Sequence, residues 1–328
     1  MPNTPMPQNS AIPPGPGPLV DTFGRRVTYV RVSVTDRCNL RCRYCMPGEN
    51  PEWIERPGIL TYEEITRFAR VAAARGVRKF RLTGGEPLVR RDLHRLVAML
   101  TALPGVEDVA LSTNGVLLEQ QAPDLRAAGL RRVNISLDTL QTARFAHITR
   151  GDQFHKTWDG IMTALHHGFS PVKLNMVVIR GFNDDEIIAM ADLTRCYPLH
   201  VRFIEYMPIG GDETDWSREK VLPAGEILDR LRAAHPMTPD THEGGACAGP
   251  ERSWRLEGAP GRVGFISPVS NEFCASCNRL RLTSDGKLRG CLMRDGELDV
   301  RAALRGGADD DALAALLAEA VRRKPETH

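Results

Sequence analysis

Six of the eight cysteines form two groups of three that lie far apart along the chain. The first triad is Cys38, Cys42 and Cys45, and the second triad is Cys274, Cys277 and Cys291. A structural zinc ion takes four protein ligands, whereas three cysteines on a four-iron, four-sulfur cluster leave one iron open to a small molecule. Each triad therefore predicts an iron–sulfur cluster whose open iron can bind and activate a ligand.

Zinc is the alternative interpretation of the same cysteines. The spacing of the first triad also fits half of a zinc knuckle, and Cys196 and Cys247 could in principle complete two four-cysteine sites. The chain would then be a non-catalytic zinc-binding protein. Neither of these two cysteines belongs to a motif. We expect Cys196 to be a buried or partly buried thiol near a helix end, and Cys247 to be exposed in a segment with glycines.

Six short runs of β-type residues must position the triads, and each run ends in a polar or glycine turn. We expect strands at 28–34, 79–83, 108–113, 132–137, 172–179 and 200–206. Helical patterns fall between most of them, at 62–74, 91–103, 118–128, 155–167 and from 186 toward 195. Capping boxes of Thr61 with Glu64 and of Asn183 with Glu186 open two of these helices.

This alternation predicts an α/β fold with a parallel sheet, either open and doubly wound or curled toward a barrel. Both architectures place ligands at the carboxyl ends of the strands. We expect three regions along the chain. Residues 1–20, with proline at seven of the first 18 positions, form a disordered leader. Residues 21–215 form the α/β body, and residues 216–328 form a smaller unit with the second triad, short strands at 262–266 and 279–282, and a helix after Arg301.

The composition is that of an ordinary globular protein, because 42% of the 328 residues are hydrophobic and 26% are charged. A formal net charge of +2 argues against nucleic acid or a membrane as the main partner. No stretch approaches the roughly 18 apolar residues that span a bilayer, and no signal-peptide core is visible. We expect a cytoplasmic protein, in which eight cysteines favour metal or redox chemistry over disulfides.

The first triad lies in the sequence VTDRCNLRCRYCMP, directly after the first expected strand, and the next expected strand ends in LTGGEP. Together they resemble the radical S-adenosylmethionine (SAM) superfamily. The resemblance implies a partial (β/α)6 barrel of the TIM type with a smaller C-terminal cluster-binding extension. It also implies that the open iron binds the methionine end of SAM and that a 5′-deoxyadenosyl radical is released. The residues that it implies for SAM binding are Tyr44, Gly85, Ser136 and Met207. We also expect the Glu86 carboxylate to face an ammonium group.

The second triad is followed by basic residues that narrow the resemblance. Arg279 and Arg281 are two apart in an expected strand, so both side chains point to one face and can form a fork for phosphate oxygens. This pattern resembles the MoaA family, the GTP 3′,8-cyclases of molybdenum cofactor biosynthesis. The resemblance implies that a second cluster binds the purine of GTP. The residues implied for GTP binding are Arg31, Arg81, Ser112, Lys173, Arg279 and Arg281, with Arg202 near the substrate.

The resemblance implies an enzyme, a radical SAM lyase that needs two [4Fe-4S] clusters and SAM. Its reaction converts GTP to (8S)-3′,8-cyclo-7,8-dihydroguanosine 5′-triphosphate, the first step of molybdopterin formation. The implied partners are GTP, an electron donor such as flavodoxin or ferredoxin, and a downstream cyclic pyranopterin monophosphate synthase, and a homodimer is left open. Another radical SAM enzyme with an auxiliary cluster, such as a peptide-modifying maturase, is the alternative within the enzymes.

The C-terminal sequence departs from the family pattern. Members of the MoaA family commonly end in two glycines that reach the active site, whereas this chain ends in RRKPETH. We therefore expect the closed site to be completed in another way, or the activity to be altered.

Overall fold

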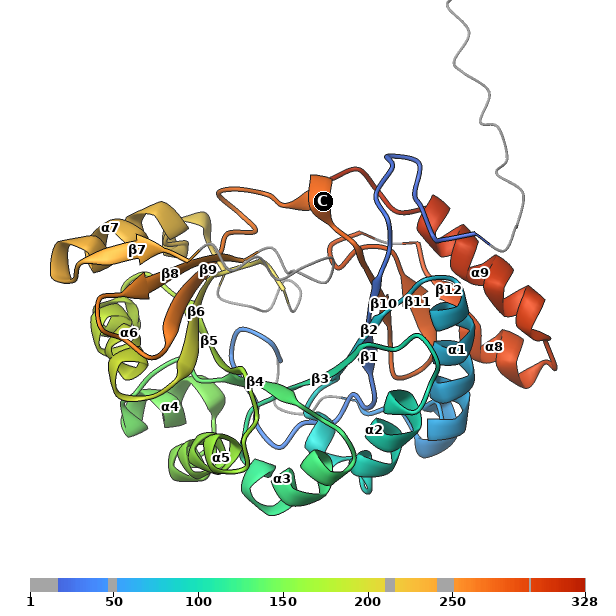
Figure 1. Ribbon diagram of the computed structural model, residues 1–328, viewed down its shortest axis with the longest axis horizontal. Helices are drawn as coiled ribbons and strands as arrows, with labels where there is room; N and C mark the ends of the chain where they lie inside the picture. Colours follow the sequence, from blue (N-terminus) through green and yellow to red (C-terminus); the bar gives the residue numbers. More distant parts are fainter. Residues whose placement is uncertain (1–16, 47–51, 210–215, 241–250, 295, 328) are drawn as a thin grey trace, which may run out of the picture.

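The computed structural model describes residues 17–46, 52–209, 216–240, 251–294 and 296–327. Its strands form one sheet in the order β12-β11-β10-β1-β2-β3-β4-β5-β6-β9-β8-β7. The sheet curves into an open arc, and helices α1 to α6 lie along the outer side of the arc (Figure 1). The fold is therefore the incomplete α/β barrel that the sequence predicts.

Six parallel strands form the centre of the sheet. They are β1 (Tyr29–Ser33), β2 (Lys79–Thr83), β3 (Asp108–Thr113), β4 (Arg132–Ser136), β5 (Val172–Val178) and β6 (Leu199–Glu205). Each coincides with an expected strand to within one or two residues. The expectation is confirmed because these runs combine β-type residues with clear turn signals at their ends.

The helices between these strands are α1 (Tyr62–Ala74), α2 (Leu93–Thr101), α3 (Leu118–Ala127), α4 (Thr142–Thr149), α5 (Phe154–His166) and α6 (Ile187–Cys196). The capping box at the start of α1 is confirmed, with Thr61 accepting from the Glu64 N–H and Glu64 accepting from the Thr61 N–H. Ile65, Phe68 and Ala69 recur at helical spacing and are buried against the sheet. The sequence did not predict α4.

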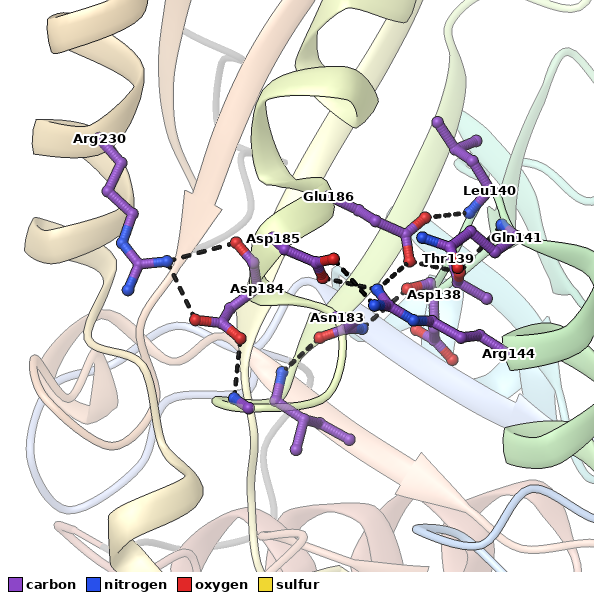
Figure 2. A network of polar contacts seen from close by, with 12 residues as sticks. Asp138, Thr139, Leu140, Gln141, Arg144, Asn183, Asp184, Asp185, Glu186 and Arg230 are labelled. Carbon is purple, nitrogen blue, oxygen red and sulfur yellow. Dashed lines mark hydrogen bonds and ion pairs between the residues drawn. The ribbon is translucent and has the colours of Figure 1, made fainter.

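The predicted capping box at Asn183 and Glu186 is wrong. Neither side chain caps a helix, because both are used in contacts with the end of β4 (Figure 2). Asn183 donates to the carbonyl oxygen of Asp138 over 2.7 Å. Glu186 accepts from the Thr139 hydroxyl and from the Leu140 N–H, both over 2.6 Å. Both side chains therefore bond to residues that are distant in sequence, although the local sequence pattern assigns them to a helix cap.

The C-terminal region extends both edges of the same sheet (Figure 1). Beside β6 lie α7 (Ala224–Ala234), β7 (Met237–Pro239), β8 (Arg252–Leu256) and β9 (Arg262–Ile266). Beside β1 lie β10 (Arg279–Leu282), β11 (Lys287–Arg289), β12 (Leu298–Asp299), α8 (Val300–Arg305) and α9 (Asp310–Arg322). The 216–328 region thus continues the sheet instead of standing apart from it, since β9 pairs with β6 and β10 pairs with β1, both in parallel.

Short 3₁₀ turns complete the description: η1 (Arg56–Gly58), η2 (Pro87–Val89), η3 (Asp184–Glu186), η4 (Arg218–Lys220) and η6 (Cys274–Ser276). Residues 1–16 of the expected leader, and Cys247, lie outside the described residues. The last part of the expected leader is ordered, because Leu19 is buried and pairs with the backbone of Arg75 and Val27. No helix in the described part of the chain combines the length and apolar character needed to cross a bilayer.

The two faces of the sheet differ around β1. The face toward the helices consists of apolar side chains that are at most 1% exposed: Val30, Val32, Phe80, Leu82, Leu280 and Leu282. Because side chains alternate along a strand, the residues between them face the inside of the arc. These inner positions are largely polar, so the arc encloses a polar interior.

Glu205, at the end of β6, fastens the C-terminal region to the barrel. Its buried carboxylate accepts from the backbone N–H groups of Ala224, Val269 and Ser270 over 2.8 to 2.9 Å. All three donors belong to the region after residue 215. Backbone N–H groups that are buried without an acceptor are costly, so this carboxylate stabilises the junction.

We predict that Glu205→Gln lowers the free energy of unfolding by about 2–3 kcal/mol, because one carboxylate oxygen becomes a donor that faces backbone donors. Urea denaturation, followed by circular dichroism, measures this change. The exposed Glu257 gives the matched control, and Glu257→Gln is expected to change stability by less than about 0.5 kcal/mol. Equal effects of the two substitutions would contradict the assignment.

Candidate functional site

The first triad lies in the loop after β1, at the carboxyl edge of the parallel strands. The end of α4 holds the backbone of this loop. The Arg41 N–H donates to the carbonyl oxygen of Thr149 over 2.8 Å, and the Arg43 N–H donates to that of Ile148 over 2.9 Å. Helix α4, which the sequence did not predict, therefore helps to hold the loop of the first triad in place.

Gly84 and Gly85 bring the end of β2 against the same loop. Gly84 has a φ of 145°, and a Cβ there would lie 2.3 Å from the carbonyl oxygen of Thr35. A Cβ on Gly85 would lie 2.4 Å from the carbonyl oxygens of both Asp36 and Arg37. The two glycines therefore permit close approach to the triad loop. The role of Gly85 in SAM binding stays a prediction.

The expectation that Glu86 faces a ligand ammonium group is wrong. Glu86 is 1% exposed, and its carboxylate accepts from the Thr113 hydroxyl (2.7 Å), the Asn114 N–H (2.6 Å) and the Leu88 N–H (3.0 Å). Burial raises the pKa of Glu86 to about 7 despite these hydrogen bonds. Glu86 joins the end of β2 to the end of β3, so its buried carboxylate stabilises the carboxyl edge of the sheet.

Tyr44, between the last two cysteines of the first triad, is held by Asp138. Its hydroxyl donates to the Asp138 carboxylate over 2.7 Å, and the same carboxylate accepts from the Val177 N–H over 2.9 Å. Asn183 holds the backbone of Asp138, so the network of Figure 2 reaches the triad loop. Burial raises the pKa of Asp138 to about 6 and that of Tyr44 well above its usual range. The tyrosine ring is thus anchored at the carboxyl edge.

The chemistry of the first triad fits an iron–sulfur cluster. Burial raises the pKa of the Cys38 and Cys42 thiols, and neighbouring thiolates raise it further. Bound iron supplies the positive charge that three neighbouring thiolates need. Among the described residues, no three histidine, cysteine, aspartate or glutamate side chains converge as ligands of one metal ion.

The other predicted SAM residues lie at the same edge. Ser136 is the last residue of β4 and is exposed, and Met207 follows β6 and is half-buried. Asn114, after β3, was missed by the sequence reasoning. Its amide donates to the Cys38 sulfur over 3.8 Å and to the Asn39 side chain over 2.7 Å. The only feature of the sequence that pointed to Asn114 was its position in the turn after an expected strand.

The second triad lies at the opposite end of β1. Cys274 belongs to η6, and Cys277 precedes Asn278, whose carbonyl oxygen accepts from the N–H groups of Thr28 and Tyr29 at the start of β1. The first triad follows the end of β1. A strand rises roughly 3.3 Å per residue, so the five residues of β1 separate the two triads by at least about 13 Å.

Basic groups surround Cys277. Burial alone would raise the pKa of its thiol, but Arg279 and Lys324 lower it to about 7. Lys324 donates to the Cys277 sulfur over 3.2 Å. A thiol that readily becomes a thiolate is a good ligand for iron, so Cys277 fits a cluster ligand.

Three arginines lie side by side between the two triads. Arg281 on β10 is the register partner of Arg31 on β1, and Arg31 is the register partner of Arg81 on β2. Neighbouring strands are about 4.8 Å apart, so the three guanidinium groups form a row on the inner face of the arc. We call these three residues the arginine row. Burial lowers the pKa of Arg31, and lowers that of Arg281 to about 9.

The arginine row lacks balancing negative charge. Within the described ranges, no carboxylate forms an ion pair with any of the three arginines, and the buried Nε atoms of Arg31 and Arg81 have no hydrogen-bond partner. Arg81 donates only weakly to the Ser112 hydroxyl, over 3.3 Å. Buried like charges without a partner are unfavourable. The row therefore favours an anion, and four of the predicted GTP residues, Arg31, Arg81, Arg281 and Ser112, are brought together.

Lys173 and Arg202 differ from the row because they face a carboxylate. Glu251, just before β8, lies 3.1 Å from the Lys173 ammonium and 3.6 Å from the Arg202 guanidinium, and it also contacts His200. Gly264 makes room for it, since a Cβ there would lie 2.3 Å from the Glu251 carboxylate. Burial lowers the pKa of Lys173 to about 8, although Glu251 opposes this shift.

Tyr29 is a further inner residue that the sequence reasoning missed. Its ring lies 4.9 Å from the Lys79 ammonium and 5.9 Å from the Arg81 guanidinium. Burial would raise its pKa, but the surrounding cations lower it to about 8. Tyr29 could have been found because it lies two positions before Arg31 on the same face. Glu251 and Lys324 carry no such signal, since folding alone brings them to the site.

Cys196, which was expected to be buried or partly buried, is exposed at the end of α6. The expectation is wrong because the cysteine occupies the solvent side of the last helical turn. Cys196 therefore lies on the outer layer of helices. The expected exposure of Cys247 stays a prediction, because that residue lies outside the described part of the chain.

Comparisons with known proteins match nearly the whole described chain to known families. The family model of the radical SAM superfamily matches residues 32–194, and the model of Molybdenum Cofactor Synthesis C matches residues 199–328. The chain is 51% identical over 311 residues to the GTP 3′,8-cyclase of Pelotomaculum thermopropionicum, covering 94% of this chain and 95% of that protein. It is 52% identical over 310 residues to the GTP 3′,8-cyclase of Moorella thermoacetica, with coverages of 94% and 95%.

Solved structures share the fold at lower sequence identity. The crystal structure of Streptococcus suis SuiB bound to precursor peptide SuiA matches with a TM-score of 0.63 and 15% identity. The match covers 86% of this chain and 66% of that chain, so this chain spans about two thirds of that protein. At this identity the likeness concerns the fold alone.

We predict that anion binding inside the arc weakens as the pH rises through about 8. Lys173 then loses its positive charge and Tyr29 gains a negative charge, because both have a pKa of about 8. Calorimetric titration of the reconstituted protein with tripolyphosphate between pH 7 and 9 should show affinity falling about tenfold. The double variant Tyr29→Phe, Lys173→Met is the control, because its affinity changes with pH only through the titration of the tripolyphosphate itself. Parallel profiles for both proteins would contradict the assignment.

Proposed function

The chain belongs to the GTP 3′,8-cyclase family of radical SAM enzymes, and we propose that the arginine row and the two triads carry out that reaction on GTP. The reaction converts GTP to (8S)-3′,8-cyclo-7,8-dihydroguanosine 5′-triphosphate, the first step of molybdenum cofactor biosynthesis. The observation that carries the proposal is the arginine row, because it is an interior anion site between two sets of cluster ligands.

The triphosphate of GTP binds the arginine row. Arg31, Arg81 and Arg281 offer several N–H donors each, and guanidinium groups suit phosphate oxygens because both can form two parallel hydrogen bonds. A triphosphate supplies the negative charge that the row needs. Ser112, whose hydroxyl lies 3.3 Å from an Arg81 nitrogen, adds a hydroxyl donor two residues closer to the carboxyl edge than Ala110, the register partner of Arg81.

Lys173 and Arg279 complete the substrate contacts. Glu251 favours the charged form of Lys173, so the ammonium is available near neutral pH. Arg279 shares the inner face with Arg281 and lies beside the second triad. These groups position the nucleotide along β1, with the base toward Cys277 and the ribose toward the first triad. Positioning of this kind can supply a large part of the rate of a reaction.

The first triad and the carboxyl edge bind SAM. Cys38, Cys42 and Cys45 would hold the cluster, which when bound would supply the electron that cleaves SAM to methionine and a 5′-deoxyadenosyl radical. Tyr44, fixed by Asp138, lies against the adenine. Gly85, Ser136 and Met207 provide further contacts to the methionine end, the ribose and the adenine.

The second triad holds a second cluster near the purine. Cys274, Cys277 and Cys291 are its ligands, and the open position is directed to the base of GTP. The thiolate of Cys277 is favoured by Arg279 and Lys324. We also propose a cytoplasmic location, a flavodoxin or ferredoxin as electron donor, and a cyclic pyranopterin monophosphate synthase as the consumer of the product. The row of buried cations argues for a nucleotide rather than a peptide, and so against a maturase.

We predict that anaerobically reconstituted protein with reductant, SAM and GTP yields 5′-deoxyadenosine and the cyclised nucleotide together. Cys42→Ala should abolish both products, because SAM cleavage requires the first cluster. Cys277→Ala should abolish the cyclised nucleotide. Liquid chromatography with mass spectrometry detects both compounds. Deoxyadenosine without cyclised GTP in the wild-type protein would mean that the substrate is wrong, and robust cyclisation by either variant would refute the roles of the triads.

We predict that Arg81→Met weakens GTP binding about tenfold or more, since a hydrogen bond to a charged group contributes roughly 1.5–3 kcal/mol. Equilibrium dialysis of the reconstituted protein measures the affinity. Arg126, which is exposed on α3, gives the control, and Arg126→Met should leave the affinity unchanged. An unchanged affinity in Arg81→Met would show that the triphosphate binds elsewhere.

A further inference from the structure

Lys324, in the C-terminal segment after α9, reaches the second triad. Although lysine is rarely buried, Lys324 is only 4% exposed. Its ammonium donates to the Cys277 sulfur over 3.2 Å, to the carbonyl oxygen of Arg279 over 3.2 Å, and to that of Gly290 over 2.9 Å. The three contacts account for its three N–H donors.

These contacts join the two parts of the second triad. Cys277 and Arg279 belong to the segment that leads into β10, whereas Gly290 directly precedes Cys291. The two segments are brought together across β10 and β11. A single ammonium group that bonds to both therefore fixes the spacing of the sulfur ligands.

The segment that carries Lys324 is itself anchored. Arg25 donates to the carbonyl oxygens of Pro325 (2.5 Å), Glu326 (2.9 Å) and Cys274 (2.8 Å). The buried carboxylate of Asp21 holds Arg25 over 2.5 Å. The end of the chain is thus tied to the same loop of the second triad through a second basic residue.

The charge of Lys324 is balanced by sulfur. Within the ranges that the structure describes, no carboxylate forms an ion pair with Lys324. The sulfur of Cys277 is in contact with the buried ammonium, and a cysteine binds a cluster as the thiolate, which is the anion that such an ammonium needs.

We propose that Lys324 is a positioning residue of the second cluster, which holds the Cys277 and Cys291 segments together and stabilises the reduced cluster through its charge. The inference rests on the proposed second cluster. Hydrogen bonds to cluster sulfurs and nearby positive charge favour the more negative, reduced state. Loss of the Lys324 charge should therefore lower the reduction potential and weaken iron binding.

The experiment uses a full-length parent that keeps only the second triad, with Cys38, Cys42 and Cys45 replaced by Ala. Lys324→Met removes the charge and the donors, Lys324→Gln removes the charge and keeps donors, and Lys324→Arg keeps the charge. The exposed Lys156 gives the control Lys156→Met. The measurements are iron loss to a chelator and the midpoint potential from a redox titration followed by electron paramagnetic resonance.

Lys324→Met is expected to lose iron about tenfold faster than the parent, the range typical of outer ligand contacts. Its midpoint potential should be more negative, with Lys324→Gln shifted in the same direction and Lys324→Arg close to the parent. If Lys324→Met does not fold, Lys324→Gln alone decides the potential. Potentials and iron loss equal to those of Lys156→Met would overturn the role of Lys324. A parent that takes up no iron and sulfide would overturn the second cluster itself, and the inference with it.

Discussion

The unbalanced charge of the arginine row is the constraint on which the site depends. Arg281, Arg31 and Arg81 lie in register on three neighbouring strands, so the sheet itself fixes their spacing. Like charges on adjacent strands are unfavourable, and the apolar outer face of the same strands does not permit the side chains to turn away. The protein therefore carries a preorganised anion site, whose cost is offset when a polyanion binds. Glu251 balances Lys173 and Arg202 on the opposite side of the arc and leaves the row unbalanced.

The sheet topology turns this anion site into a reaction site. The first triad follows the carboxyl end of β1, and the second precedes β10, which runs parallel to β1. Parallel pairing places the two triads at opposite ends of the row, with one strand length between them. The C-terminal region joins the sheet at both of these pairings, β10 with β1 and β9 with β6. The same pairing supplies Arg281 as a member of the row, so the proposed substrate site and the proposed second cluster site use neighbouring residues of one segment.

Much of the fold could be predicted from the sequence, because the six central strands are marked by local composition and by the turns that follow them. The first triad, Arg31 and Arg81 were also accessible, since motif and alternation determine their edge and face. Glu86, Asn183 and Glu186 were misassigned because each has a local interpretation that a distant partner overrides. Glu251 and Lys324 could not be predicted, since nothing in their neighbourhood shows that folding places them beside Lys173 and Cys277. Cys196 was misjudged because a helix end does not reveal which side faces solvent.

The most direct test of the central claim is an anaerobic crystal structure of the reconstituted protein with GTP. We expect triphosphate oxygens at about 2.7–3.2 Å from guanidinium nitrogens of Arg31, Arg81 and Arg281, with the base toward Cys277. A triphosphate bound outside the arc, or a nucleotide whose base lies toward the first triad, would contradict it.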